Sequence, residues 1–366
     1  MFKRSLPVLL ISVFTIFSFA QTSSISQPKI TRQKSGTTQL LIAVSPVNSQ
    51  VVWAAGTGGT YVLTTDGGNT WKAGVVPGAE ALQFRDVQGV SDRVAYLMSI
   101  GNNTTDFRIY KTWDAGATWH VQFVNQVPNA FYDCMAFWKP NQGIVHSDSL
   151  NGVFLDRRTF SGQKWHSITA NMPPALPGEA SFSSSGTCIT TQGDANAWAT
   201  TGGATTSRIL ATRDAGNTWN AYDTPLISSP SAGGLSVAFR DGMHGIVGGG
   251  DLAVNYRIQL ATSADGGQTW TLTKKPPIGG TIFCLAYANG MTLNATEPVD
   301  HAFDRTVVIT SETAPNFTSG AAAWTPDEGQ TWYRIPGVNG NWAVAFANPH
   351  AGWFVGNNGE IVKISF

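Results

Sequence analysis

The chain has 366 residues and no net formal charge, and charged residues make up 13% of it, against about 25% in an average soluble protein. Neutrality removes the electrostatic argument for a nucleic-acid or anionic-membrane partner, so neither is expected. The 39 glycines, 13 tryptophans and 11% aromatic content favour an all-β protein with many tight turns over a helical one.

The N-terminus has the pattern of a secretory signal. Lys3 and Arg4 are followed by an apolar run to Phe19, and small residues precede a cleavage site after Ala20. An uncleaved anchor is the alternative, but the run is shorter than the roughly 20 residues that a spanning helix needs. We therefore expect residues 1–20 to be a signal peptide, residues 21–366 to form one domain, and the protein to be secreted or periplasmic, with no later transmembrane segment.

One eight-residue pattern is repeated along the chain. It reads Ser or Thr, any residue, Asp, any residue, Gly, any residue, Thr, Trp, and a single copy would be weak evidence. Five copies keep every fixed position: Thr64–Trp71, Thr112–Trp119, Thr212–Trp219, Ser263–Trp270 and Thr325–Trp332. Internal repetition of this kind predicts a repeat architecture.

The spacing of the copies predicts a sixth turn. Successive tryptophans of the pattern lie 48, 100, 51 and 62 positions apart, so the gap of 100 holds two periods. Midway through that gap lies a degenerate copy from Asp156 to Trp165, which we interpret as a longer loop with Gly162 displaced.

A second pattern runs in phase with the turns and predicts a pair of strands. Val237–Phe239 precedes Gly245–Gly248, and Val344–Phe346 precedes Gly352–Gly356, after which the chain ends with only three strands of its unit. A radial array of four-stranded sheets closes when one sheet combines strands from both termini, and the segment from Ile30 to Gln33 can supply the missing strand. We predict an all-β, seven-bladed β-propeller of four-stranded antiparallel blades, with the last blade closed by an N-terminal strand.

The residue types that all five copies of the turn share suit structural roles. Asp accepts backbone hydrogen bonds, Gly takes a positive φ, and Trp starts the outer strand and packs between sheets. These structural positions are Asp66, Gly68, Trp71, Asp114, Gly116, Trp119, Asp214, Gly216, Trp219, Asp265, Gly267, Trp270, Asp327, Gly329 and Trp332.

With these motifs, the sequence resembles the Asp-box (bacterial neuraminidase repeat) propellers. Within that group it is similar to small exported propellers related to photosystem II assembly factors, and more distantly to sialidases and sortilin-type receptors. The resemblance extends over about residues 30 to 366 and implies the fold, while the functions in the group differ widely.

The sialidase resemblance implies an arginine triad, a Tyr–Glu pair and an acidic Asp, together with a Tyr-Arg-Ile-Pro motif on an inner strand. This chain has Tyr333–Pro336 directly after the last repeat tryptophan, which places Arg334 on an outer strand and argues against a catalytic role. The six glutamates show no pairing with a second carboxylate, which glycoside hydrolysis usually needs. We predict no catalytic residue, metal or cofactor.

Two further features leave alternatives open. The segment from Glu297 to Arg305 could hold a metal through Glu297, Asp300, His301 and Asp304, or be a solvated loop, which is the simpler interpretation. Aligned on the repeats, Cys134, Cys188 and Cys284 occupy one position of the inner strands, where Ser236 lies in the fifth blade. They are buried thiols, or Cys134 and Cys188 form a disulfide if their Cα atoms lie within about 7 Å.

A ligand is expected on the face opposite the repeated turns. Arg108, Arg208 and Arg257 occupy equivalent or nearly equivalent positions near that face, and together they could present a positive arc to a carboxylate, a sulfate or an acidic partner. The alternative is three solvated arginines on separate blades.

Three functions remain in competition. The leading hypothesis is an exported, non-enzymatic binding or assembly propeller, monomeric, with a protein or glycan partner. The second is a glycan-active hydrolase of the sialidase type, which would need converging carboxylates or an arginine cluster in a central pocket. The third is a purely structural propeller with flat contact surfaces and no pocket.

Overall fold

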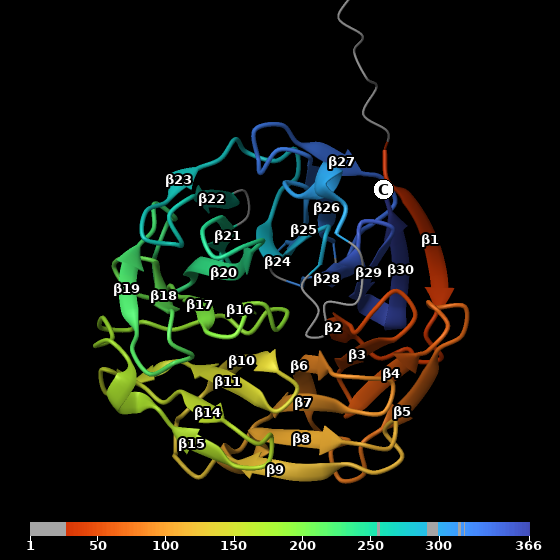
Figure 1. Ribbon diagram of the computed structural model, residues 1–366, viewed down its shortest axis with the longest axis horizontal. Coiled ribbons are helices and arrows are strands. Elements are labelled where there is room, and N and C mark those ends of the chain that lie inside the picture. Colours follow the sequence, from red (N-terminus) through yellow and green to blue (C-terminus); the bar gives the residue numbers. More distant parts are fainter. Residues whose placement is uncertain (1–26, 255–256, 291–298, 314–315, 318) are drawn as a thin grey trace, which may run out of the picture.

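The computed structural model describes residues 27–254, 257–290, 299–313, 316–317 and 319–366, and the predicted signal peptide lies outside them. The described residues form seven four-stranded antiparallel sheets arranged around one axis, as Figure 1 shows. The predicted fold class, an all-β seven-bladed propeller, is confirmed. No helix in this part of the chain is long and apolar enough to cross a membrane.

Each blade runs from an innermost strand to an outermost strand. The innermost strands are β2 (Leu41–Pro46), β6 (Gln83–Gly89), β10 (Tyr132–Lys139), β16 (Ile189–Gln192), β20 (Ala232–Phe239), β24 (Thr281–Tyr287) and β28 (Asn341–Asn348). The second strands are β3 (Val52–Gly56), β7 (Ala95–Ile100), β11 (Gln142–Ser147), β17 (Asn196–Thr200), β21 (Gly245–Asp251), β25 (Val307–Glu312) and β29 (Ala351–Gly356). We number the blades 1 to 7 in this order.

The outermost strand of each blade is more exposed than the third strand beside it. The third strands are β4 (Thr60–Thr64), β8 (Arg108–Thr112), β14 (Arg157–Thr159), β18 (Arg208–Thr212), β22 (Gln259–Ser263), β26 (Ala321–Thr325) and β30 (Glu360–Ser365). The outermost strands are β5 (Lys72–Val75), β9 (His120–Val124), β15 (Trp165–Ser167), β19 (Asn220–Asp223), β23 (Thr271–Leu272), β27 (Tyr333–Ile335) and β1 (Lys29–Lys34). A hairpin, β12 (Ser149–Leu150) and β13 (Val153–Phe154), and the 3-10 turns η1 (Thr104–Asp106), η2 (Thr169–Asn171), η3 (His301–Phe303) and η4 (Asn357–Gly359) lie between strands.

The two ends of the chain meet in blade 7. Strand β1 pairs antiparallel with β30, from Lys29 opposite Ser365 to Lys34 opposite Glu360, so the red and blue ends of the colour scale lie side by side in Figure 1. The predicted N-terminal strand therefore closes the last blade. Gln33 also joins β1 to blade 1, because its Oε1 accepts from the Trp71 indole at 3.1 Å.

The five repeated turns connect third and fourth strands through one hydrogen-bond pattern. In the first, Asp66 Oδ1 accepts from the Thr64 hydroxyl at 2.8 Å and from the Thr70 amide at 2.9 Å, while Thr64 Oγ1 accepts from the Gly68 amide. Hydrogen bonds from Thr70 hold the pKa of Asp66 at about 2. The pattern glycines, Gly68, Gly116, Gly216, Gly267 and Gly329, all have φ between 83° and 89°, which only glycine adopts without strain.

The residue after each pattern aspartate ties the turn to its own blade. The Gly67 amide donates to Gln50 O in the turn between β3 and β2, and the Ala115, Ala215, Gly266 and Glu328 amides make the equivalent bond in their blades. The turns between first and second strands therefore share one face of the propeller with the repeated turns. We call this the turn face.

The degenerate copy in blade 3 differs from our prediction. Asp156 precedes β14 and is not in the turn, which runs from Thr159 to Trp165 and is shorter than the repeated turns. Thr159 Oγ1 still accepts from the Gly162 amide at 2.9 Å, and Gly162 has φ of 68°. The turn forms because the hydroxyl-to-amide bond survives, while Asp156 is buried and accepts instead from the Ser147 amide and contacts His146 Nδ1.

A repeated bulge shapes the innermost strands. In six blades one residue is skipped in the register with the second strand, for example between Phe84 and Asp86 and between Ile282 and Cys284. The residues that follow the bulge, together with Cys188 in blade 4, form a ring: Ala43, Asp86, Cys134, Cys188, Ser236, Cys284 and Ala343. Small or polar side chains suit this ring because neighbouring strands lie close there.

Candidate functional site

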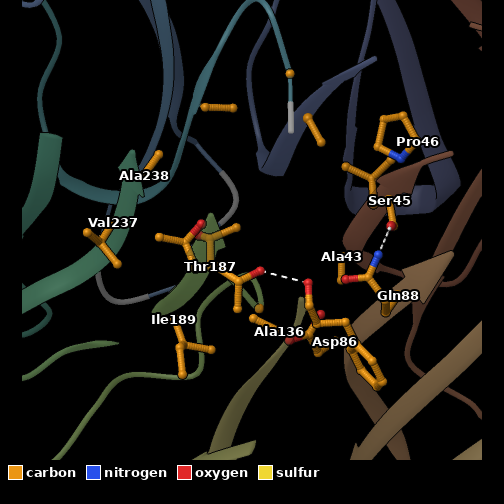
Figure 2. Close-up of a pocket in the computed structure, with 18 of the residues that line it drawn as sticks. Ala43, Ser45, Pro46, Asp86, Gln88, Ala136, Thr187, Ile189, Val237 and Ala238 are labelled. Carbon is orange, nitrogen blue, oxygen red and sulfur yellow. Dashed lines mark hydrogen bonds between the residues drawn. The ribbon is translucent and has the colours of Figure 1, made fainter. Parts of the chain in front are cut away.

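A cavity of about 550 Å³ lies on the propeller axis and is lined by the C-terminal halves of the innermost strands. Ala136, Ala238 and the polar pair Ser45 and Gln88 are among the side chains at its wall in Figure 2. The turn from Thr191 to Asp194 also lines it, so this axial cavity faces the turn face. We expected a ligand on the opposite face; the structure places this concave site on the turn face.

The far end of the axial cavity is covered by the segment Ser183–Thr187. Its hydroxyls bind across the axis to blade 6, since Ser184 Oγ and Ser185 Oγ donate to Phe283 O at 3.0 and 2.6 Å. From blade 2, Arg85 donates to Ser183 O at 3.1 Å. These bonds come from distant parts of the sequence, and the cavity is consequently a pocket with one closed end.

Asp86 is the buried carboxyl group of the cavity wall. It is 6% exposed, and its Oδ2 accepts from the Met135 amide of the next blade at 2.7 Å. Burial raises the pKa of Asp86 well above its ordinary value. Ser236 and Cys284 occupy the same ring and accept from Leu285 and Val344 amides, so all three side chains satisfy backbone donors that a free strand edge would leave unpaired.

The other charged groups at the cavity are paired with protein partners. Arg240 bonds Glu328 at 2.8 Å and Asp241 at 2.8 Å, and Asp194 pairs with Lys139 at 3.2 Å. Among the described residues, Asp86 and Asp194 are the carboxyl groups in the lining. The wall therefore offers mainly hydroxyl, amide and apolar groups to an occupant.

The structure does not bring Arg108, Arg208 and Arg257 into one site. Arg208 is 9% exposed and holds the fully buried Glu179 carboxylate, with Nε at 2.9 Å from Oε1 and Nη2 on Oε2. Arg108 donates to Thr105 O at 2.8 Å, and Arg257 lies 3.9 Å from Asp251. The three guanidinium groups belong to separate blades, each beside a partner near in space.

Cys134 and Cys188 form a disulfide between blades 3 and 4, with their Cα atoms 5.9 Å apart. This decides between the two alternatives that the sequence left open. Cys284 is a free, buried thiol whose pKa burial raises.

The insertion in blade 6 is described only in part, and Glu297 lies outside the described residues. Asp300 caps η3 by accepting from the Ala302 amide, and Asp304 contacts His301 Nδ1 at 3.0 Å. Within the described ranges, no group of three or more His, Cys, Asp or Glu side chains is placed to hold a metal ion. Arg334 lies on β27, an outermost strand, as its sequence position indicated.

The buried Glu312 at the end of β25 predicts a pH-dependent stability. Burial raises the pKa of Glu312 to about 8, from an ordinary value of 4.5. The folded state therefore keeps a proton that the unfolded chain has lost, and this contribution is full below about pH 4.5 and disappears as the pH rises through 8. We expect the free energy of unfolding, measured with urea, to fall in the wild type between about pH 5 and pH 8.5. In Glu312→Gln this fall should be smaller, by on the order of 1–3 kcal/mol. Equal slopes would contradict the assignment.

The closed ring of seven four-stranded blades and its axial pocket define the class: a single β-propeller. No protein-family profile matches the sequence, and no curated protein matches it. Solved structures do match, and the fold fits that of YCF48-like propellers.

Three similar structures illustrate this fold. YCF48 bound to D1 peptide has a TM-score of 0.61 and 15% identity, covering 94% of this chain and 98% of that chain. YCF48 from Cyanidioschyzon merolae has a TM-score of 0.62 and 14% identity, covering 92% and 98%. The GH74 xyloglucanase from Xanthomonas campestris has a TM-score of 0.61 and 13% identity, with 91% of this chain matching 53% of the enzyme.

Proposed function

We propose that this protein is an exported propeller that binds a segment of another protein in its axial cavity. The observation that carries the proposal is the cavity itself, which is closed at one end and walled mainly by hydroxyl, amide and apolar groups. A similar structure, that of YCF48, contains a D1 peptide. The signal-like N-terminus and the Cys134–Cys188 disulfide support export, since disulfides persist in oxidising compartments.

The lining gives less support to a glycan hydrolase. Such enzymes use two carboxyl groups on either side of the scissile bond. Here Asp86 is buried against the Met135 amide, and Asp194 is 79% exposed and paired with Lys139. Neither Asp86 nor Asp194 has the environment of the two carboxyl groups that act as nucleophile and general acid in such an enzyme.

Filling the cavity tests the proposal. Ala238 is a half-buried residue of the wall, and Ala238→Phe places a ring in the space without removing any hydrogen bond of the wall. Immobilised protein should capture a defined protein from the host's envelope extract, identified by mass spectrometry, and Ala238→Phe should lose it. Ala117→Phe makes the same change on an exposed turn residue of the same face and should keep it.

Two results would contradict the proposal. One is capture that is equal for wild type and Ala238→Phe when both variants unfold cooperatively. The other is turnover of fluorogenic sialosides or glucosides that Asp86→Asn abolishes, which would favour the hydrolase.

A further inference from the structure

A second concave site lies on the turn face between blades 2 and 3, apart from the axial cavity. This groove has a volume of about 300 Å³ and is lined by Val90, Val94, Lys111, Trp113, Pro140, Asn141 and Gln163. It combines apolar side chains, two amide side chains, one indole and one ammonium group. Such a small set of polar groups among apolar ones is typical of small-molecule sites.

Lys111 carries a buried positive charge in this groove. It is 8% exposed, its Nζ donates to Asn141 Oδ1 at 3.0 Å, and it lies 4.7 Å from the Tyr96 ring and 5.8 Å from the Trp113 ring. None of the ion pairs among the described residues involves Lys111, and burial lowers the pKa of its ammonium. An ammonium has three donors, and burying its charge without an anion costs free energy, so the site favours an anionic ligand.

Blade 7 provides a comparison for Lys111. Lys363 occupies the same strand position, opposite Trp353 as Lys111 is opposite Tyr96. Its ammonium lies 5.3 Å from the Trp353 ring and donates to Gly67 O at 3.0 Å. A lysine ammonium over an aromatic ring therefore occurs in both blades. The groove beside Lys111 differs from the surroundings of Lys363 in having Trp113 and the amide side chains of Asn141 and Gln163.

Trp113 provides a flat and fixed apolar wall. It is 46% exposed, although the imidazole of His120 stacks on it with centroids 4.6 Å apart and planes at 14°. In the other four repeated turns this position holds Thr65, Arg213, Ala264 or Pro326. The exposed indole is therefore not required by the turn, and its π face suits the C–H face of a sugar ring, which carries partial positive charge.

We propose that this groove binds an anionic sugar residue, with the ring against Trp113 and the carboxylate on the Lys111 ammonium. A uronic acid residue offers the apolar face, the hydroxyls and the charge that the indole, the amides and the ammonium complement. An aspartate or glutamate side chain offers the charge alone and leaves Trp113 uncovered.

The test is a titration of the full-length protein with trigalacturonate and with neutral cellotriose, followed by tryptophan fluorescence and calorimetry. Trigalacturonate should bind about tenfold more tightly than cellotriose, and Lys111→Met should remove that difference. Trp113→Ala should weaken the binding of both sugars by about tenfold or more. The matched control Lys363→Met should change neither affinity by more than about twofold, a difference too small to count as a lost interaction.

Several outcomes would overturn the proposal. These are no binding of trigalacturonate by wild type, equal affinities of wild type and Lys111→Met, or tighter binding of hexaglutamate than of trigalacturonate. If Lys111→Met fails to fold, the salt dependence of binding provides the second measurement. Raising the salt concentration should weaken the binding of the acidic sugar and leave the binding of the neutral sugar unchanged. Ala238→Phe should not affect either sugar, so failure of this proposal is distinguishable from failure of the axial-cavity function.

Discussion

A chain that begins at Ser35 is expected to lose on the order of 5 kcal/mol of folding free energy or more, because it lacks β1. The six residues of β1 pair along the whole of β30, and each backbone hydrogen bond contributes about 1 kcal/mol net. Without β1, the edge of β30 is unpaired and open to association with other chains. The contacts from Gln33 to Trp71 and to Gly67 O, which join blade 7 to blade 1, are lost as well.

Urea unfolding followed by circular dichroism, together with size-exclusion chromatography, measures this effect. A chain beginning at Gln27 is the control and should unfold at the same urea concentration as the full-length protein. A synthetic peptide of residues 27–36 should restore part of the stability when added to the shortened chain. The importance of ring closure would be refuted by a shortened chain that remains monomeric and as stable as the control.

The parts of the fold that sequence predicted correctly depend on short-range interactions. Each repeated turn is complete within eight residues. Thr64 donates to Asp66 and accepts from the Gly68 amide, and Thr70 donates to Asp66, so no distant group is involved. The closing strand followed from counting: three strands after Asn341 require a fourth from elsewhere. Both inferences use information that lies along the chain.

The degenerate turn of blade 3 shows how a pattern can be aligned wrongly. Asp156 looked like the missing pattern aspartate because it precedes a glycine and a tryptophan. In the structure it is fully buried beside His146 and Ser147 of β11, while the turn has its own bond from the Gly162 amide to Thr159 Oγ1. A hydroxyl-to-amide bond with a glycine at positive φ is sufficient, and the aspartate is replaceable.

The axial cavity and the groove could be predicted only in part. Aligning the ring position through all seven blades would have placed Asp86 in the same ring as Ser236 and Cys284. The tryptophan at position 113 is also unusual among the repeated turns. The segment Ser183–Thr187, which closes the cavity, has no repeated counterpart, and Asn141 reaches Lys111 from another blade. Such contacts depend on how blades pack against one another, which the spacing of repeats does not encode.

The three arginines illustrate the same limit and lead to the second large effect. Arg108 and Arg208 start equivalent strands, but only Arg208 meets a buried carboxylate, because Glu179 comes from the linker before blade 4. Leu176 N and Thr201 Oγ1 also donate to Glu179. The pair fixes that linker to the third strand.

Replacing Arg208 by leucine is expected to lower the free energy of unfolding by about 3–5 kcal/mol, because it leaves the Glu179 charge buried without its cation. The double variant Glu179→Gln/Arg208→Leu removes that charge and should recover part of the loss. Arg257→Leu is the control: this side chain is 59% exposed, and its loss should cost no more than about 0.5 kcal/mol. Urea unfolding of the four proteins at pH 7 measures all three differences. A loss in Arg208→Leu no larger than that in Arg257→Leu would mean that Glu179 is held by its neutral donors and that Arg208 remains available to a ligand.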